Sequence, residues 1–195
     1  MSLPYPYLAL LLFAAACGGA APPPPPPERA RDAAAAVTQD TAFRGTTAPL
    51  ERAGRAAVGG GRGGALLRAV RADSQRGYDR IVFEFAGDSI PGYHIGYARG
   101  PVVRCGSGDP VAPLGSGRLV VRFEPARAHD DMGRASVERR TAAPGLPSIK
   151  DLQIVCDFEG QVEWVLGVPA GAPYRVLELT APARLVLDVR HGREP

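Results

Sequence analysis

Apolar and polar side chains alternate along the C-terminal part of the chain, beginning near Tyr78. The clearest run, 79–85, puts Ile81, Phe83 and Phe85 on one face and charged side chains on the other. A period of two residues indicates a half-buried β-strand. Comparable runs lie at 93–98, 118–124, 152–158, 161–168, 174–180 and 184–190. The pattern predicts about seven short strands.

Turn-forming residues separate these runs, as in the segments AGDS, GSGDP, LGSG and FEGQ. Together they predict an all-β fold, a single antiparallel β-sandwich. Alternation within 152–158 is expected to turn Leu152, Ile154 and Cys156 to the same face. One connection, Pro125 to Pro147, is long enough to hold a functional loop.

The N-terminus carries a short apolar run, Leu8 to Ala16, which suits a signal peptide better than a membrane-spanning helix. Small residues then meet Cys17, an arrangement that resembles the lipobox of bacterial lipoproteins. It predicts a signal peptide over 1–16, a lipid on Cys17, and anchoring at the outer face of the cell membrane. Ala14 replaces the usual leucine, however, and the first seven residues lack Lys and Arg. An incidental cysteine after a signal sequence is the alternative.

Residues 17–75 differ in composition from the rest of the chain, with six consecutive prolines, a glycine cluster and few aromatic residues. Such a segment buries too little apolar surface to offset the entropy of ordering. We therefore expect a disordered tether there and a folded domain at 76–192.

The positive charge of the chain belongs to the expected tether. Residues 18–76 hold nine arginines and five acidic residues, whereas residues 77–195 hold fourteen basic and fifteen acidic residues. Nucleic-acid binding requires a basic face on the folded part, so the balance argues against a nucleic-acid partner.

Several dispersed motifs carry a family resemblance over about residues 76–191. GYDRIVFEF, PGYHIGY, GSGDPV, FEPARAHD, CDFEGQVEWVLGV and PYRVLELTAPARLVLDVRH occur in this order. Together they resemble the AMIN-like domain of secreted proteins and lipoproteins of high-GC Gram-positive bacteria. The family is named after AMIN domains, β-sandwich modules that bring cell-wall amidases and pilus secretins to the envelope and are associated with peptidoglycan binding. The resemblance implies a fold and an envelope context, and it transfers no catalytic residue.

The three cysteines fit an exported protein. Once Cys17 is lipidated, Cys105 and Cys156 remain as an even pair in an oxidising compartment, and we expect a disulfide between them. A reactive thiol or a metal ligand is the alternative. Neither cysteine has the close Cys or His neighbours that a metal site needs.

Other polar residues offer weak candidates for a site. His129 and Asp130 begin the segment HDD, which suits either a metal or acid–base site or a hydrogen-bonded loop corner. Tyr93 and Tyr97 are candidate ligand-binding residues on a strand. No nucleophile elbow surrounds any serine, and the sequence indicates no metal and no cofactor. His94 and His191 are expected to be structural or solvated, and the carboxylates of Asp157 and Glu159 to belong to a turn.

These observations favour a membrane-anchored envelope lipoprotein without catalytic activity. Its expected ligand is a cell-wall polymer, peptidoglycan, or an envelope protein. A small hydrolase acting on cell-wall material is the alternative.

Overall fold

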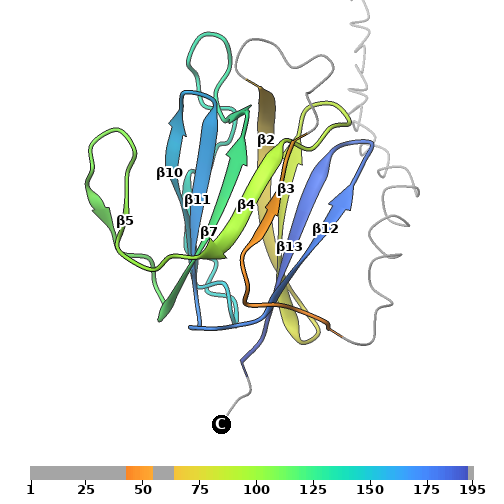
Figure 1. Ribbon diagram of the computed structural model, residues 1–195, viewed down its shortest axis with the longest axis vertical. Coiled ribbons are helices and arrows are strands. Elements are labelled where there is room, and N and C mark those ends of the chain that lie inside the picture. Colours follow the sequence, from red (N-terminus) through yellow and green to blue (C-terminus); the bar gives the residue numbers. More distant parts are fainter. Residues whose placement is uncertain (1–42, 55–63, 193–195) are drawn as a thin grey trace, which may run out of the picture. The chain divides into compact units, whose positions relative to one another are not determined.

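The computed structural model describes residues 43–54 and 64–192 (Figure 1). These residues form thirteen strands and no helix, so the predicted all-β fold is confirmed. No helix long and apolar enough to cross a membrane occurs in this part of the chain.

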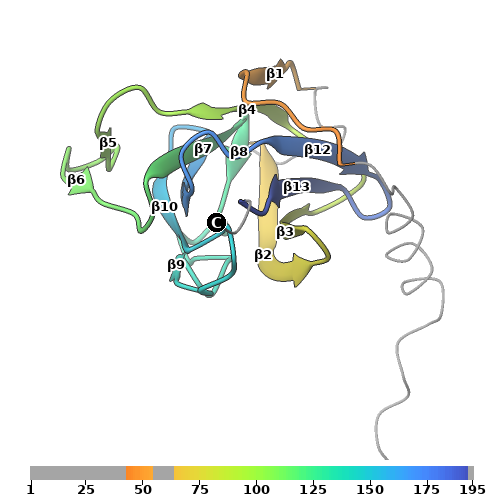
Figure 2. The same cartoon turned by 90° about the horizontal axis from the view of Figure 1, so that it is seen from below.

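Two sheets pack face to face as a sandwich, and Figure 2 shows them edge-on. The six-stranded sheet has the order β1 (Leu50–Arg52), β4 (Gly92–Tyr97), β7 (Gly117–Glu124), β11 (Gln161–Val168), β10 (Asp151–Phe158) and β9 (Thr141–Ala142). The five-stranded sheet has the order β12 (Tyr174–Leu179), β13 (Arg184–Arg190), β3 (Tyr78–Phe85), β2 (Ala65–Gln75) and β8 (Ala126–Arg127). Neighbours are antiparallel, except that β2 and β8 run parallel.

The seven strands predicted from alternation are all present, as β3, β4, β7 and β10 to β13. Their inward side chains meet in one apolar core, which includes the fully buried Trp164. The ring of Phe83 meets the rings of Trp164 and Phe123 edge-on, and Phe85 meets Phe123 in the same way. This is the geometry that aromatic quadrupoles favour.

The expected start of the folded domain at Arg76 is too late. Residues 65–75, assigned above to the tether, form β2, which pairs with β3 along its length. A bulge between Leu67 and Ala69 breaks the two-residue period, so the inward positions Leu67, Val70 and Ala72 do not alternate regularly. The signal peptide, Cys17 and the rest of the expected tether up to residue 42, together with 55–63, lie outside the described residues.

Residues 43–52 also belong to the fold, and we call them the N-terminal strap (orange in Figure 1). Its strand β1 pairs with β4 of the six-stranded sheet, while Thr46 bridges to Tyr174 of the five-stranded sheet. The buried hydroxyl of Tyr174 lies within hydrogen-bonding distance of the carbonyl oxygens of Ala48 and Ile95, at 2.7 and 2.9 Å. The strap thus joins the two sheets along one side of the sandwich.

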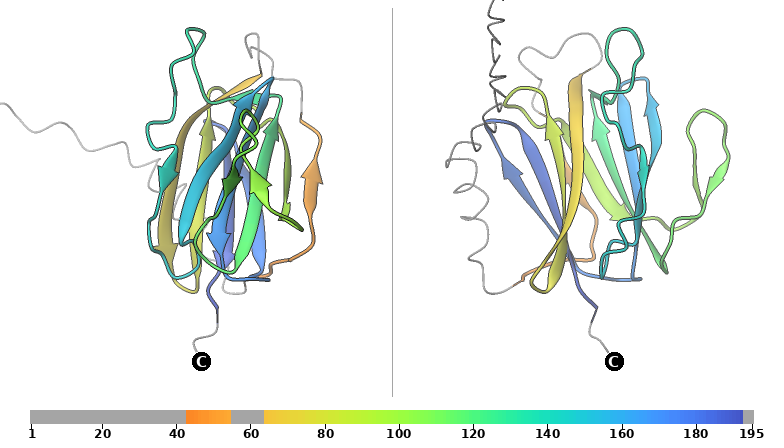
Figure 3. Two further views of the ribbon diagram at one scale, coloured as in Figure 1. Left: turned by 90° about the vertical axis from the view of Figure 1, so that its left-hand side faces the viewer. Right: turned by 180° about the vertical axis from the view of Figure 1, so that it is seen from behind.

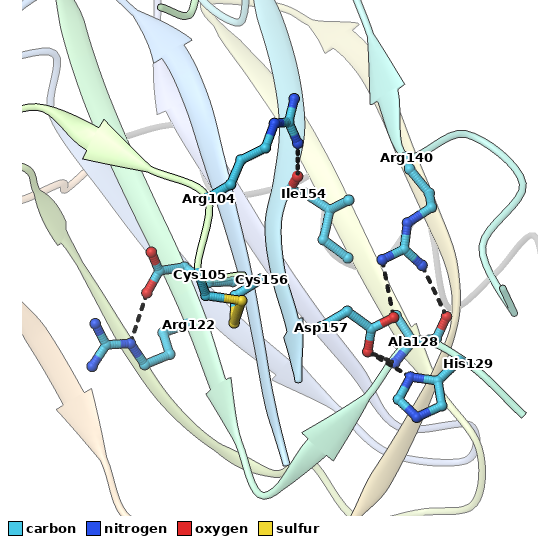
Figure 4. Close-up of a disulfide and its surroundings, with 10 residues drawn as sticks. Arg104, Cys105, Arg122, Ala128, His129, Arg140, Ile154, Cys156 and Asp157 are labelled. Carbon is cyan, nitrogen blue, oxygen red and sulfur yellow. Dashed lines mark hydrogen bonds and ion pairs between the residues drawn. A yellow bond between two sulfur atoms is a disulfide. The ribbon is translucent and has the colours of Figure 1, made fainter. Parts of the chain in front are cut away.

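A small hairpin of β5 (Val102–Val103) and β6 (Pro110–Val111) lies against the outer face of the six-stranded sheet. Val102 and Val111 pack there on Val155 and Val165. The predicted disulfide is present in the connection between the two strands, joining Cys105 to β10 (Figure 4). It fastens the hairpin to the sheet.

The predicted orientation of Cys156 is wrong because β10 contains a bulge. Ile154 pairs with Trp164, but the next register pair is Cys156 with Glu163. Two residues of β10 therefore oppose one of β11, and Val155 and Cys156 both face the hairpin. Glu163 itself reaches Arg122 on the same outer face, at 2.8 Å.

Asp79 and His191 form a pair with a structural role. Asp79 is fully buried and accepts hydrogen bonds from the backbone amides of Ser148 and Ile149. Nε2 of His191 lies 2.7 Å from its other oxygen. His191 thereby ties the end of the described chain to β3, as expected for a structural residue.

Candidate functional site

Tyr93, one of the candidate ligand-binding residues, lies in a polar cleft beside β1. Its hydroxyl donates a hydrogen bond to Oε1 of Glu178, at 2.9 Å, and Arg52 forms an ion pair with the same oxygen. Burial raises the pKa of Tyr93, and the nearby carboxylate of Glu178 raises it further. The three residues come from β4, β12 and β1, so the cleft crosses from one sheet to the other.

Two hollows flank this triad, and both are lined by Arg52, Ala53 and Tyr93. One has a volume of about 230 Å³ and adds hydroxyl and carboxylate groups from Asp88, Ser89 and Thr180. The other has a volume of about 390 Å³ and adds His94, Arg122, Glu51 and Glu124. We call the two hollows together the Tyr93 cleft. Hydroxyls, carboxylates and guanidinium groups around an aromatic ring suit a polar, multiply hydroxylated ligand better than an apolar one.

Tyr97, the second predicted tyrosine, takes no part in this cleft. It lies on the same face of β4, but its hydroxyl donates to the backbone carbonyl of Ala172 at 2.7 Å. Its ring meets the ring of Tyr174 edge-on, with centroids 6.3 Å apart. Burial, reinforced by Tyr174, raises the pKa of Tyr97 to about 12. The contacts of Tyr97 serve the packing of the sandwich.

His129 pairs with Asp157, a carboxylate that was expected in a turn and that lies on β10. Its Nδ1 lies 2.9 Å from Oδ1 of Asp157 on β10, while Arg140 donates to the other oxygen at 3.0 Å (Figure 4). Burial alone would raise the pKa of Asp157, but hydrogen bonds from the Ala128 amide, Arg140 and His129 outweigh it and lower the pKa. This cluster fastens the start of the 125–147 connection to β10.

Asp130 points into its own turn and does not join that cluster. It accepts hydrogen bonds from the backbone amides of Met132 and Arg134 and from the Arg134 guanidinium. These bonds, chiefly those from Arg134, lower the pKa of Asp130. The described residues contain no group of three or more His, Cys, Asp and Glu side chains suited to a metal ion. The geometry matches the hydrogen-bonded loop corner that the sequence left open.

A larger groove of about 690 Å³ lies on the side of the sandwich away from β1. One wall is β2 and the other is the 125–147 connection, which appear side by side in Figure 3, right. Apolar side chains in its lining include Val70, Ala72 and Leu152, which also pack on the core. We call it the β2 groove. Its β2 wall was missed because those residues were assigned to the tether, whereas the long connection was recognised.

Comparison with known proteins gives one family. The model of the AMIN-like domain matches residues 65–191, which is more than half of the chain. The match begins at the first residue of β2 and ends one residue after β13. No curated protein matched the chain.

Proposed function

Because the chain belongs to the AMIN-like domain family, we propose that it is a lipid-anchored module that binds peptidoglycan without catalysing a reaction. AMIN-like domains are extracytoplasmic domains of the cell envelope and are of the binding type. The match over residues 65–191 is the observation that carries the proposal. The proposal goes beyond this match in two points, the lipid on Cys17 and peptidoglycan as the polymer.

The Tyr93 cleft is the proposed contact with the polymer. Peptidoglycan offers sugar hydroxyls, amides and carboxylates, and the cleft offers matching donors and acceptors at Ser89, Thr180 and Arg122. The ring of Tyr93, which is only partly buried, is the proposed stacking surface for a sugar ring. The paired charges of Arg52 and Glu178 hold that side chain in place.

The proposed lipid anchor rests on the lipobox-like segment that ends at Cys17. A lipid there would keep the domain at the outer face of the membrane, with residues 18–42 between anchor and strap. Metabolic labelling with a fatty-acid analogue should mark the wild-type chain and leave Cys17→Ser unmarked. Equal labelling of both chains contradicts the anchor.

Sedimentation with purified cell walls tests the binding. The full chain carrying Cys17→Ser should sediment with peptidoglycan sacculi and remain in solution with an insoluble control polymer such as cellulose. Tyr93→Ala combined with Ser89→Ala should weaken sedimentation at least about tenfold, equivalent to about 1.4 kcal/mol. Ser74→Ala, on the exposed part of β2, is the matched control and should bind like the parent. Equal binding to both polymers contradicts the proposal.

A further inference from the structure

The Tyr93 cleft includes residues that precede the part of the chain matched by the AMIN-like family. The match begins at residue 65, at the start of β2. The hollow of about 390 Å³ is nevertheless lined by residues 51–54, which are the end of the strap and the two residues after it. Arg52 and Ala53 line the smaller hollow as well. The cleft is therefore complete only when the strap lies on β4.

Few contacts hold the strap on the sandwich. Three register pairs join β1 to β4 (Figure 2), and two backbone hydrogen bonds join Thr46 to Tyr174, at 2.8 and 2.9 Å, beside the Tyr174 hydroxyl described above. No residue of the described segment 43–54 is fully buried, and Leu50 is the only one of its apolar side chains that packs against the core. Segments with few buried apolar contacts open at a lower free energy than the core. The strap can therefore detach without unfolding the sandwich.

Two glycines bring the end of the strap into backbone contact with β4. A Cβ atom placed on Gly54 would overlap the backbone nitrogen of Gly92, and one placed on Gly92 would lie 2.7 Å from the nitrogen of Gly54. Neither residue can carry a side chain unless the two backbones move apart. This contact lies two residues after Arg52, whose ion pair with Glu178 holds the carboxylate that accepts the hydrogen bond from Tyr93.

Glu51 is the residue of the strap best placed to contact a ligand. It pairs in register with His94, which in turn pairs with Arg122. The three side chains therefore lie on one face of neighbouring strands, and all of them line the larger hollow. Arg122 is already paired with Glu163, whereas the exposed carboxylate of Glu51 forms no hydrogen bond or ion pair with the described residues. Its oxygens are free to accept hydrogen bonds from hydroxyl and amide groups of a ligand.

We propose that the strap is part of the binding site, with Glu51 as its ligand contact, and that ligand and strap hold each other in place. This role of the strap rests on the proposed binding of peptidoglycan at the Tyr93 cleft. A ligand that contacts Glu51 on the strap and Arg122 on the sandwich has a higher affinity for the protein with the strap docked than with the strap detached. By linkage, the ligand stabilises the docked strap by the same factor. The binding unit then begins at residue 43, ahead of the matched domain.

Sedimentation of the full chain carrying Cys17→Ser with peptidoglycan sacculi tests the role of Glu51. Glu51→Ala should weaken binding at least about tenfold, while Glu138→Ala, an exposed glutamate at the β2 groove, should bind like the parent. Tyr93→Ala combined with Ser89→Ala separates the two proposals. If that pair weakens binding and Glu51→Ala does not, the cleft remains a binding site and the role of the strap is overturned. If neither changes binding, the polymer binds elsewhere and both proposals fail.

Amide hydrogen exchange tests the coupling independently of sedimentation. Soluble peptidoglycan fragments released by lysozyme should slow exchange at Thr46 and in β1 of the parent chain. Gly54→Ala should speed exchange at the same amides and weaken sedimentation at least about tenfold, whereas Gly100→Ala, where a Cβ atom meets open space, should do neither. A cooperative melting transition identifies the folded variants, and Glu51→Ala decides the question if Gly54→Ala does not fold. Slowed exchange confined to other strands, or faster exchange of the strap with parental binding, overturns the proposal.

Discussion

The backbone amide of Cys105 donates a hydrogen bond to the carbonyl of Val155 at 3.0 Å, immediately beside the disulfide to Cys156. The β5–β6 hairpin is thus held by a covalent bond, a backbone hydrogen bond and a cluster of valines. The hydrogen bond and the valines remain when the disulfide is cut.

Removing the disulfide should destabilise the domain without changing its architecture. A loop of 51 residues corresponds to about 4 kcal/mol in the chain-entropy model, so Cys105→Ser with Cys156→Ser should lower the melting temperature on the order of 10 °C. Calorimetry measures this, and thiol titration of the unreduced wild type should find no reactive thiol at either position. A variant that melts with the wild type would show that the covalent bond contributes nothing.

Tyr97 should ionise only at high pH, because burial raises its pKa to about 12. Its folded pKa of about 12 lies above the unfolded value of about 10. The stability it contributes is therefore fully present below pH 10 and is lost as the pH rises toward 12. Absorbance titration near 295 nm should lose its transition near pH 12 in Tyr97→Phe. An unchanged titration curve would show that the hydroxyl of Tyr97 is not the group that ionises near pH 12.

Asp157 should make the domain sensitive to acid. Its pKa is lowered in the folded state, so the stability it contributes is present above the unfolded value of about 3.9 and is lost as the pH falls through the lower folded value. Asp157→Asn should cost about 1–3 kcal/mol at pH 7 and flatten the decline below pH 4. Urea unfolding from pH 2.5 to 7 measures both effects. Glu159→Gln, in the exposed turn, is the control and should retain the wild-type decline.

Trp164 should tolerate phenylalanine better than alanine. Trp164→Ala leaves a large cavity in the core and should cost about 3–5 kcal/mol. The indole N–H has no hydrogen-bond partner among the described residues, so Trp164→Phe removes an unsatisfied donor along with part of the ring and should cost less. Denaturant unfolding ranks the two variants. Equal losses would contradict this ranking.

The seven strands predicted from alternation were recognisable because each turns one face to the core, which imposes alternation directly on the sequence. The turn of β10 and β11 was equally clear, since Glu159 and Gly160 both have positive φ, at 50° and 79°, as a two-residue hairpin requires. Strand β2 was missed for the opposite reason. Its bulge and its open edge leave no regular period, and arginine and alanine give it the composition of the preceding segment.

The candidate site was predictable only in part. Tyr93 was identified as a candidate, but its partners Arg52 and Glu178 come from strands far apart in the sequence. The same limit applies to His129, whose partner is Asp157 rather than the neighbouring Asp130. Such pairs are set by strand order and register, which a periodic pattern does not encode. The bulge that turned Cys156 outward is likewise a matter of register.

The N-terminal strap also determines how the domain carries load. A pull on the chain from its N-terminal side enters the described structure at Phe43 and meets the bridge between Thr46 and Tyr174 first. The three register pairs of β1 with β4 come next. The force therefore acts first on Tyr174 of the five-stranded sheet and then on β4 of the six-stranded sheet, before it reaches the other strands. A domain pulled from this end would lose the strap's pairing with β4 and with Tyr174 first, while the two sheets of the sandwich stay packed together.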